Sequence, residues 1–134
     1  MNKTLMTAVA ALMLAGAGAA HLRADMDMDM GAGSAAAKTV TLKGEVLDMD
    51  CFMNEGAHGK KHQDCAVMCL NNGAPVGLLT DDGKAYFLTA NEAKGKMKFY
   101  NHVREWGGDR VTITGVVQER AGTLSLRVDS AAKL

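Results

Sequence analysis

The feature that most restricts the fold of this chain is a series of short segments rich in β-branched and other apolar residues. Turn signals separate them, and Asp81-Asp82-Gly83 and Ala121-Gly122 each join two segments as a hairpin. The expected strands are 39–47, 76–80, 84–88, 110–118 and 123–128. Gly44 lies inside the first strand, where it predicts a bulge or a bend.

The residues between the first and second strands break this β pattern. Residues 63–70 predict a helix, which Asn71-Asn72-Gly73 ends, and Gly56 and Gly59 disfavour an earlier start. Residues 91–106 predict a short helix and a loop. The order of elements therefore predicts a mainly β fold, a small five-stranded OB-like barrel with a helix inserted after strand 1.

The N-terminal residues have the pattern of an export signal. A positive charge at Lys3 precedes a short apolar run, and small residues follow, with cleavage expected after Ala19 or Ala20. We expect a signal peptide at 1–20, a Met/Asp- and Gly/Ala-rich linker at 21–38 and one OB-like metal-binding domain at 39–134. The D-M-D-M-D-M run within the linker is expected to be either solvated chain or a thioether-rich arm, because methionine sulfur suits Cu(I).

Composition narrows the range of partners. Basic and acidic residues balance at 15 each, so the chain lacks the positive charge of a nucleic-acid binder. The apolar run near the N-terminus is too short for a membrane span, and no later segment is long enough. We expect no nucleic-acid partner, no membrane span and a periplasmic location.

All three cysteines lie in one stretch, together with two of the four histidines. His58, His62, Cys65 and Cys69 are spaced so that a helix would bring all four to nearly the same side. Imidazoles and thiols gathered on one side are the ligands that soft and borderline metal ions prefer. The two glycines before Lys60 make His58 the least secure member of this row.

An odd number of cysteines leaves at least one thiol outside any intramolecular disulfide. Cys65 and Cys69 are four residues apart on the expected helix, with Cβ atoms about 6 Å apart, whereas a disulfide needs about 3.8 Å. Cys51 could pair with either, and such a disulfide is one of the two interpretations that the sequence leaves open.

A metal site is the other interpretation, and it uses all three thiols. The expected ligands are Cys51, His62, Cys65 and Cys69, and the expected ion is copper or zinc. The secondary candidates are His58, Met53 and Met68. Met68 is also expected as a core residue, since it lies to the side of the Cys65/Cys69 face.

Two further sets of residues have more than one interpretation. Asp48 and Asp50 are expected either to accept a hydrogen bond from a metal-bound histidine or to be solvated at the end of the first strand. Cys65 with His62 forms a pair that a thiol enzyme could use. We expect no enzymatic activity, with thiol catalysis as the alternative.

Three segments of the sequence resemble those of a known group of proteins. They are G-E-V-L-D-M-D-C-F, H-Q-D-C-A-V-M-C-L-N-N-G-A-P-V-G-L-L-T-D-D-G-K-A-Y-F-L and V-T-I-T-G-V-V. Over residues 40–128 the chain resembles a family of small, largely uncharacterised exported bacterial proteins that look OB-like. The family motif maps onto Cys51, His62, Cys65, Cys69, Gly73 and Pro75. The resemblance implies the fold and the location of the site, and it implies no activity.

The sequence as a whole predicts an exported metal-binding protein of the periplasm that takes part in metal handling or resistance. Its expected partners are a metal ion and a periplasmic metal-handling protein. The alternative is an OB-like interaction module without metal, stabilised by a Cys51 disulfide.

Overall fold

The structure, a computed structural model, describes residues 38–134. The signal peptide expected at 1–20 and the linker expected up to residue 38 lie outside these residues, apart from Lys38. All three cysteines lie within the described residues.

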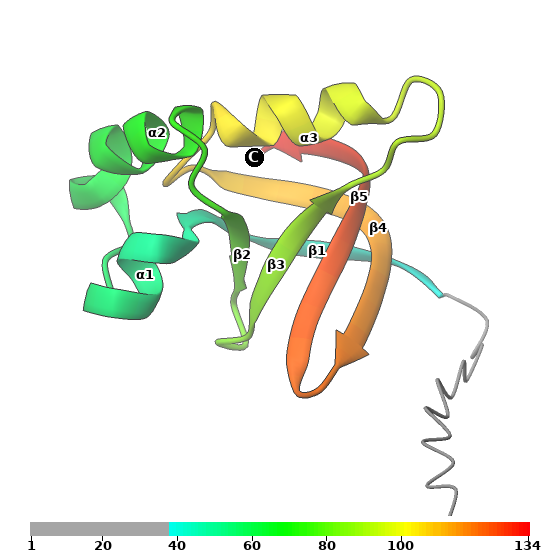
Figure 1. Cartoon of the computed structure of the whole chain (residues 1–134), viewed down its shortest axis with the longest axis horizontal. Coiled ribbons are helices and arrows are strands. Elements are labelled where there is room, and N and C mark those ends of the chain that lie inside the picture. The colour runs from blue at the N-terminus through cyan, green and yellow to red at the C-terminus, as the bar shows by residue number, and fades with distance from the viewer. Residues whose placement is uncertain (1–37) are drawn as a thin grey trace, which may run out of the picture. The chain divides into compact units, whose positions relative to one another are not determined.

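Five strands close into one barrel, with the neighbour order β1-β2-β3-β5-β4. The strands are β1 (Thr39–Asp48), β2 (Val76–Thr80), β3 (Ala85–Ala90), β4 (Arg110–Arg120) and β5 (Thr123–Lys133). β3 and β5 are parallel, and every other pair of neighbouring strands is antiparallel. This arrangement confirms the expected mainly β, OB-like barrel (Figure 1).

β1 closes the barrel because it pairs with two neighbours in succession. Its first part pairs with β4 and its last part with β2, and Gly44 pairs with both Thr80 and Val111. A Cβ atom at Gly44 would lie 2.3 Å from the Leu79 carbonyl oxygen, so only glycine allows this close approach. The register shift of the sheet lies at Thr114/Gly115 instead, so the bulge expected at Gly44 is wrong.

The helices lie outside the barrel. They are α1 (Met49–Glu55), the 3₁₀ helix η1 (Lys60–His62), α2 (Gln63–Asn71) and α3 (Met97–Arg104). α1 and α2 both belong to the insertion after β1, whereas α3 connects β3 to β4 and lies across one end of the barrel (Figure 1). The expected helix at 63–70 is confirmed, and α1 is an additional helix that the sequence did not predict.

A single apolar core fills the barrel and the space beneath the helices. The strands contribute alternate side chains, as their period of two requires. The buried members are Val46, Leu70, Val76, Leu78, Tyr86, Leu88, Val103, Val111, Ile113, Leu126 and Val128. Leu70 comes from α2 and Val103 from α3, so both helices are fixed to the barrel by side chains with no exposed surface.

β5 continues five residues beyond its expected end at residue 128. Ser130, Ala131 and Ala132 have weak β propensity by themselves, but they pair with β4 opposite Thr114, Ile113 and Thr112. Pairing with a neighbouring strand overrides local propensity here.

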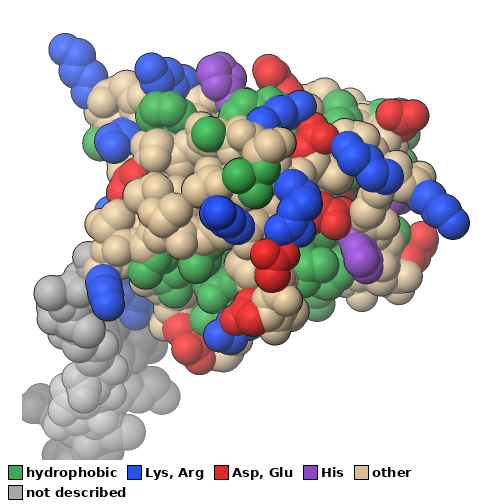
Figure 2. Space-filling model, turned by 180° about the vertical axis from the view of Figure 1, so that it is seen from behind, with side chains coloured by type: hydrophobic (Ala, Val, Ile, Leu, Met, Phe, Trp, Pro, Cys, Tyr) green, Lys and Arg blue, Asp and Glu red, His purple; other side chains and the backbone are tan. Residues whose placement is uncertain are grey.

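The surface carries both signs of charge. Figure 2 shows lysine and arginine side chains interspersed with aspartate and glutamate over one face of the molecule. This mixture agrees with the balanced charge of the sequence.

Candidate metal centre

Cys51 is positioned by the capping of α1. Asp48, the last residue of β1, precedes the helix, and its Oδ1 accepts hydrogen bonds from the backbone N–H of Asp50 at 3.0 Å and of Cys51 at 3.5 Å. An aspartate in this position satisfies backbone donors that have no partner within the helix. The chain therefore turns directly from the barrel into α1 and places Cys51 in its first turn.

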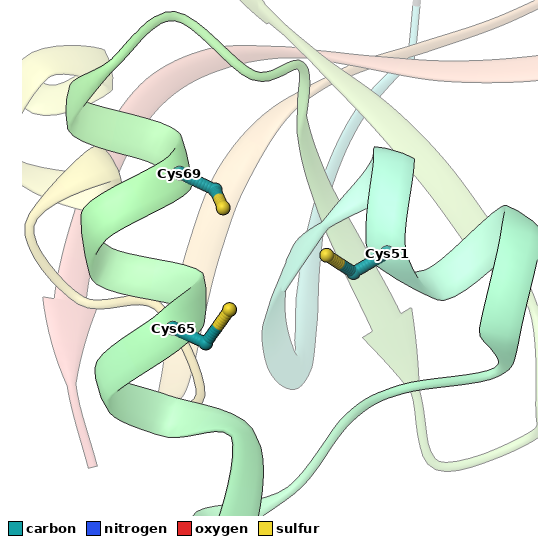
Figure 3. Close-up of side chains that lie close together, drawn as sticks. All are labelled: Cys51, Cys65 and Cys69. Atoms are coloured by element: carbon teal, nitrogen blue, oxygen red, sulfur yellow. The ribbon is translucent and has the colours of Figure 1, made fainter.

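Cys65 and Cys69 are positioned by α2. Their four-residue spacing brings both to one face of the helix, while Ala66 and Leu70 are buried on the neighbouring face at 2% and 0% exposure. Figure 3 shows the two thiols directed toward the Cys51 thiol across the space between α1 and α2.

The three sulfur atoms form a compact group. The Sγ atoms of Cys51, Cys65 and Cys69 all lie within 4.8 Å of one another, and each residue is half-buried. All three cysteines are free, so none of the disulfides left open by the sequence is formed in this structure. We call this set the thiol group.

His62 belongs to a second group of potential ligands. Its members are Asp48, Cys51 and His62, whose donor atoms also lie within 4.8 Å of one another. The four ligands expected from the sequence are thus divided between two groups, with Cys51 common to both. We call this second set the mixed group.

Asp48 is the residue of the site whose surroundings were hardest to predict from the sequence. It is buried, with 1% of its surface exposed, so solvation at the strand end is wrong for it. Its Oδ2 atom has no hydrogen-bond partner, and the same is true of the Nε2 atom of His62. A signal was present in the sequence, because an aspartate three residues before Cys51 is well placed to cap a helix there.

The segment that carries His62 is tied to the barrel at two points. The backbone N–H of Gly59 donates a hydrogen bond to the Glu45 carboxylate. Asp109, just before β4, accepts from Gln63 Nε2 at 2.8 Å and pairs with Lys60 Nζ at 3.1 Å. These contacts hold the chain on both sides of His62.

α2 can approach the barrel closely because the loop before β4 contains two glycines. A Cβ atom at Gly107 would lie 2.9 Å from the Val67 nitrogen and 3.0 Å from the Ala66 carbonyl carbon. At Gly108, which has a φ of +72°, it would lie 3.0 Å from the Gln63 Cα. No local pattern in the sequence connects this loop with the site.

The surroundings of Cys51 and Cys69 favour protonated thiols over thiolates. The neighbouring Asp48 carboxylate, followed by burial, raises the pKa of Cys51 to about 12. Burial, followed by the neighbouring Cys65 thiol, raises the pKa of Cys69. Both thiols are therefore protonated at neutral pH unless a cation compensates the negative charge of Asp48 and the thiolates.

The secondary candidates have other surroundings. His58 is half-exposed, with Nδ1 3.7 Å from the Glu45 carboxylate and its ring against Phe52, and it belongs to neither group. Met53 and Met68 are 67% and 58% exposed. The core position expected for Met68 is therefore wrong. Coordination by either thioether stays a prediction.

Comparisons with known proteins leave this site to be interpreted from its own geometry. No family model matches the chain, and no curated protein matches its sequence. Within the part of the chain that the structure describes, no helix is long and apolar enough to span a membrane.

Proposed function

We propose that this protein is exported to the periplasm and binds a copper or zinc ion there through Cys51, Cys65 and Cys69. The observation that carries the proposal is the convergence of the three sulfur atoms from two different helices. Cys51 lies in α1, whereas Cys65 and Cys69 lie in α2, and a loop and η1 separate the two helices. The position of Cys51 beside the other two is therefore a result of the fold. His62 is the nitrogen donor expected from the sequence, and the structure places it next to Cys51.

The sulfur positions fit a metal ion of this kind. A zinc ion bound at about 2.3 Å by tetrahedrally arranged thiolates separates them by about 3.8 Å. Sulfur atoms within 4.8 Å of one another can reach that spacing through small side-chain movements. Cu(I) is satisfied by two or three thiolates, so the thiol group suits either ion.

The odd number of cysteines supports metal binding over a purely structural disulfide. A Cys51 disulfide would leave a third thiol unused in an oxidising compartment. A metal ion uses all three. The raised pKa values of Cys51 and Cys69 argue against either of these two thiols as a nucleophile, since a nucleophilic cysteine needs a lowered pKa.

Metal titration of the reduced full chain tests the proposal. Zinc and Cu(I) are added against a chromophoric chelator of known affinity, and the same titration is done on Cys51→Ser, Cys65→Ser and Cys69→Ser variants. We expect each serine variant to lose at least ten-fold in affinity, whereas His58→Gln, a change of a neighbouring imidazole outside both groups, retains wild-type affinity.

The alternative interaction module predicts a different outcome. In that case the protein purified from the periplasm contains a Cys51 disulfide, and it retains no metal even after reduction and reconstitution. This result would overturn the proposed metal site.

A further inference from the structure

Two buried polar atoms in the structure lack hydrogen-bond partners, and they belong to two neighbouring residues of the site. Among the buried side-chain nitrogen and oxygen atoms of residues 38–134, only Asp48 Oδ2 and His62 Nε2 are unpaired. Both residues belong to the mixed group, within 4.8 Å of each other and of the Cys51 sulfur.

Leaving such atoms unpaired has a cost. A buried donor or acceptor without a partner costs about 1–3 kcal/mol, and a charged one costs more. Buried polar groups in proteins are nearly always paired, so two unpaired atoms at one point indicate that a ligand satisfies both. A carboxylate oxygen and an imidazole nitrogen are both electron-pair donors, and the ligand that accepts from both is a cation.

The donor types indicate what kind of cation this is. One oxygen, one nitrogen and one sulfur match a borderline divalent ion such as zinc, whereas the three sulfurs of the thiol group suit a softer ion equally well. Three protein donors also leave one coordination position open.

We propose that Asp48, Cys51 and His62 hold a second metal ion, and that the Cys51 thiolate bridges it to the ion in the thiol group. This inference rests on the proposed function, because the first ion occupies the site proposed there. In this arrangement His62 is a ligand of the second ion rather than the fourth ligand of the first. A thiolate sulfur has enough lone pairs to bind two ions at once.

Charge balance supports two ions in place of one. Three thiolates and the Asp48 carboxylate bring four negative charges into a half-buried site. One divalent ion would leave two of them uncompensated, which is costly away from water. Two divalent ions neutralise all four.

The number of zinc ions bound by the reduced full chain tests the second position. It is measured by equilibrium dialysis and elemental analysis for the wild type and for Asp48→Asn, His62→Gln and His58→Gln variants. Asparagine is as good an N-cap as aspartate, so Asp48→Asn keeps α1 capped while it removes the charge. His62 is partly exposed, so His62→Gln provides a second variant that is expected to fold.

We expect two zinc ions per chain for the wild type and the His58→Gln control, and one for Asp48→Asn and His62→Gln. When cobalt replaces zinc, the thiolate-to-cobalt absorption of these one-ion variants should persist, since their thiol group is intact. One ion in the wild type, or two in both Asp48→Asn and His62→Gln, overturns the second position and leaves the proposed function standing. No bound ion in the reduced wild type overturns the proposed function itself and the second position with it.

Discussion

The buried carboxylate of Asp48 lies beside the Cys51 thiol and raises the pKa of that thiol to about 12. The same carboxylate accepts from the Cys51 backbone N–H at the start of α1. Asp48 thus caps α1 and also keeps the Cys51 thiol protonated unless a cation binds beside it.

Replacing this carboxylate should lower the pKa of the Cys51 thiol. In Asp48→Asn the negative charge beside Cys51 is gone, so we expect the pKa of Cys51 to fall from about 12 toward its ordinary value of 9.0. At a fixed, mildly alkaline pH, alkylation of Cys51 should become faster, as followed by mass spectrometry of the metal-free protein. Asp50→Asn is the matched control, since Asp50 is exposed. Equal alkylation rates in the two variants would contradict the role given to Asp48.

Metal binding should release protons. The pKa values of Cys51 and Cys69 are raised, so both thiols are protonated at neutral pH and each must lose its proton to bind an ion. The apparent affinity for zinc should therefore rise as the pH rises. Calorimetric titrations in two buffers of different ionisation enthalpy measure the number of protons released, and we expect two or more for the first ion. A binding heat independent of the buffer would show that these thiols are not the ligands.

The close approach of α2 to the barrel should depend on Gly107. In Gly107→Ala the new methyl group meets the backbone of Ala66 and Val67. Overpacking of this kind costs about 1–3 kcal/mol, and the displaced helix should also bind zinc more weakly. Urea unfolding and zinc titration measure the two effects.

Gly115→Ala is the control that distinguishes an effect on the position of α2 from a general loss of stability. Its methyl group would lie 2.1 Å from the Arg127 carbonyl oxygen, between β4 and β5. We expect this variant to lose stability but to keep wild-type zinc affinity while it is folded. The same loss of zinc affinity in both variants would show that Gly107 does not act through α2.

The turn between β2 and β3 should contribute to stability in a pH-dependent way. The hydrogen bond from Thr80, followed by the interaction with Lys84, lowers the pKa of Asp82 from 3.8 to about 2. Because the folded state has the lower pKa, this contribution is complete above about pH 4 and is lost as the pH falls toward 2. Thr80→Val removes the hydroxyl group and should move the pKa of Asp82 up toward 3.8, as measured by NMR titration of its carboxyl carbon. Thr89→Val on the exposed side of β3 should leave it near 2. A value near 2 in Thr80→Val would assign the shift to Lys84 instead.

The barrel could be predicted from the sequence because each strand has a recognisable local sequence pattern. Alternating apolar residues and short turns define the hairpin around Gly83 and the one around Gly122, and both are present in the structure. The parallel pairing of β3 with β5 and the continuation of β5 to Lys133 depend on contacts between distant segments. Local propensity carries no signal for them.

The site was predictable in its residue types but not in its grouping. The spacing of Cys65 and Cys69 places both on one helical face, which the structure confirms. The capping turn at Asp48 creates α1, and it is this turn that buries the carboxylate beside Cys51. Asp48 and Asp50 both precede Cys51 closely in the sequence, but the capping turn buries Asp48 and leaves Asp50 exposed.

Counting reactive thiols tests most directly whether one metal site unites the three thiols. The reduced full chain is alkylated with and without bound zinc, and the number of modified cysteines is read by intact-mass spectrometry. We expect three modified cysteines in the metal-free protein, none while zinc is bound, and three again after the metal is removed by a chelator. If Cys51, Cys65 and Cys69 react as fast with zinc present as without it, the thiol group is not a metal site.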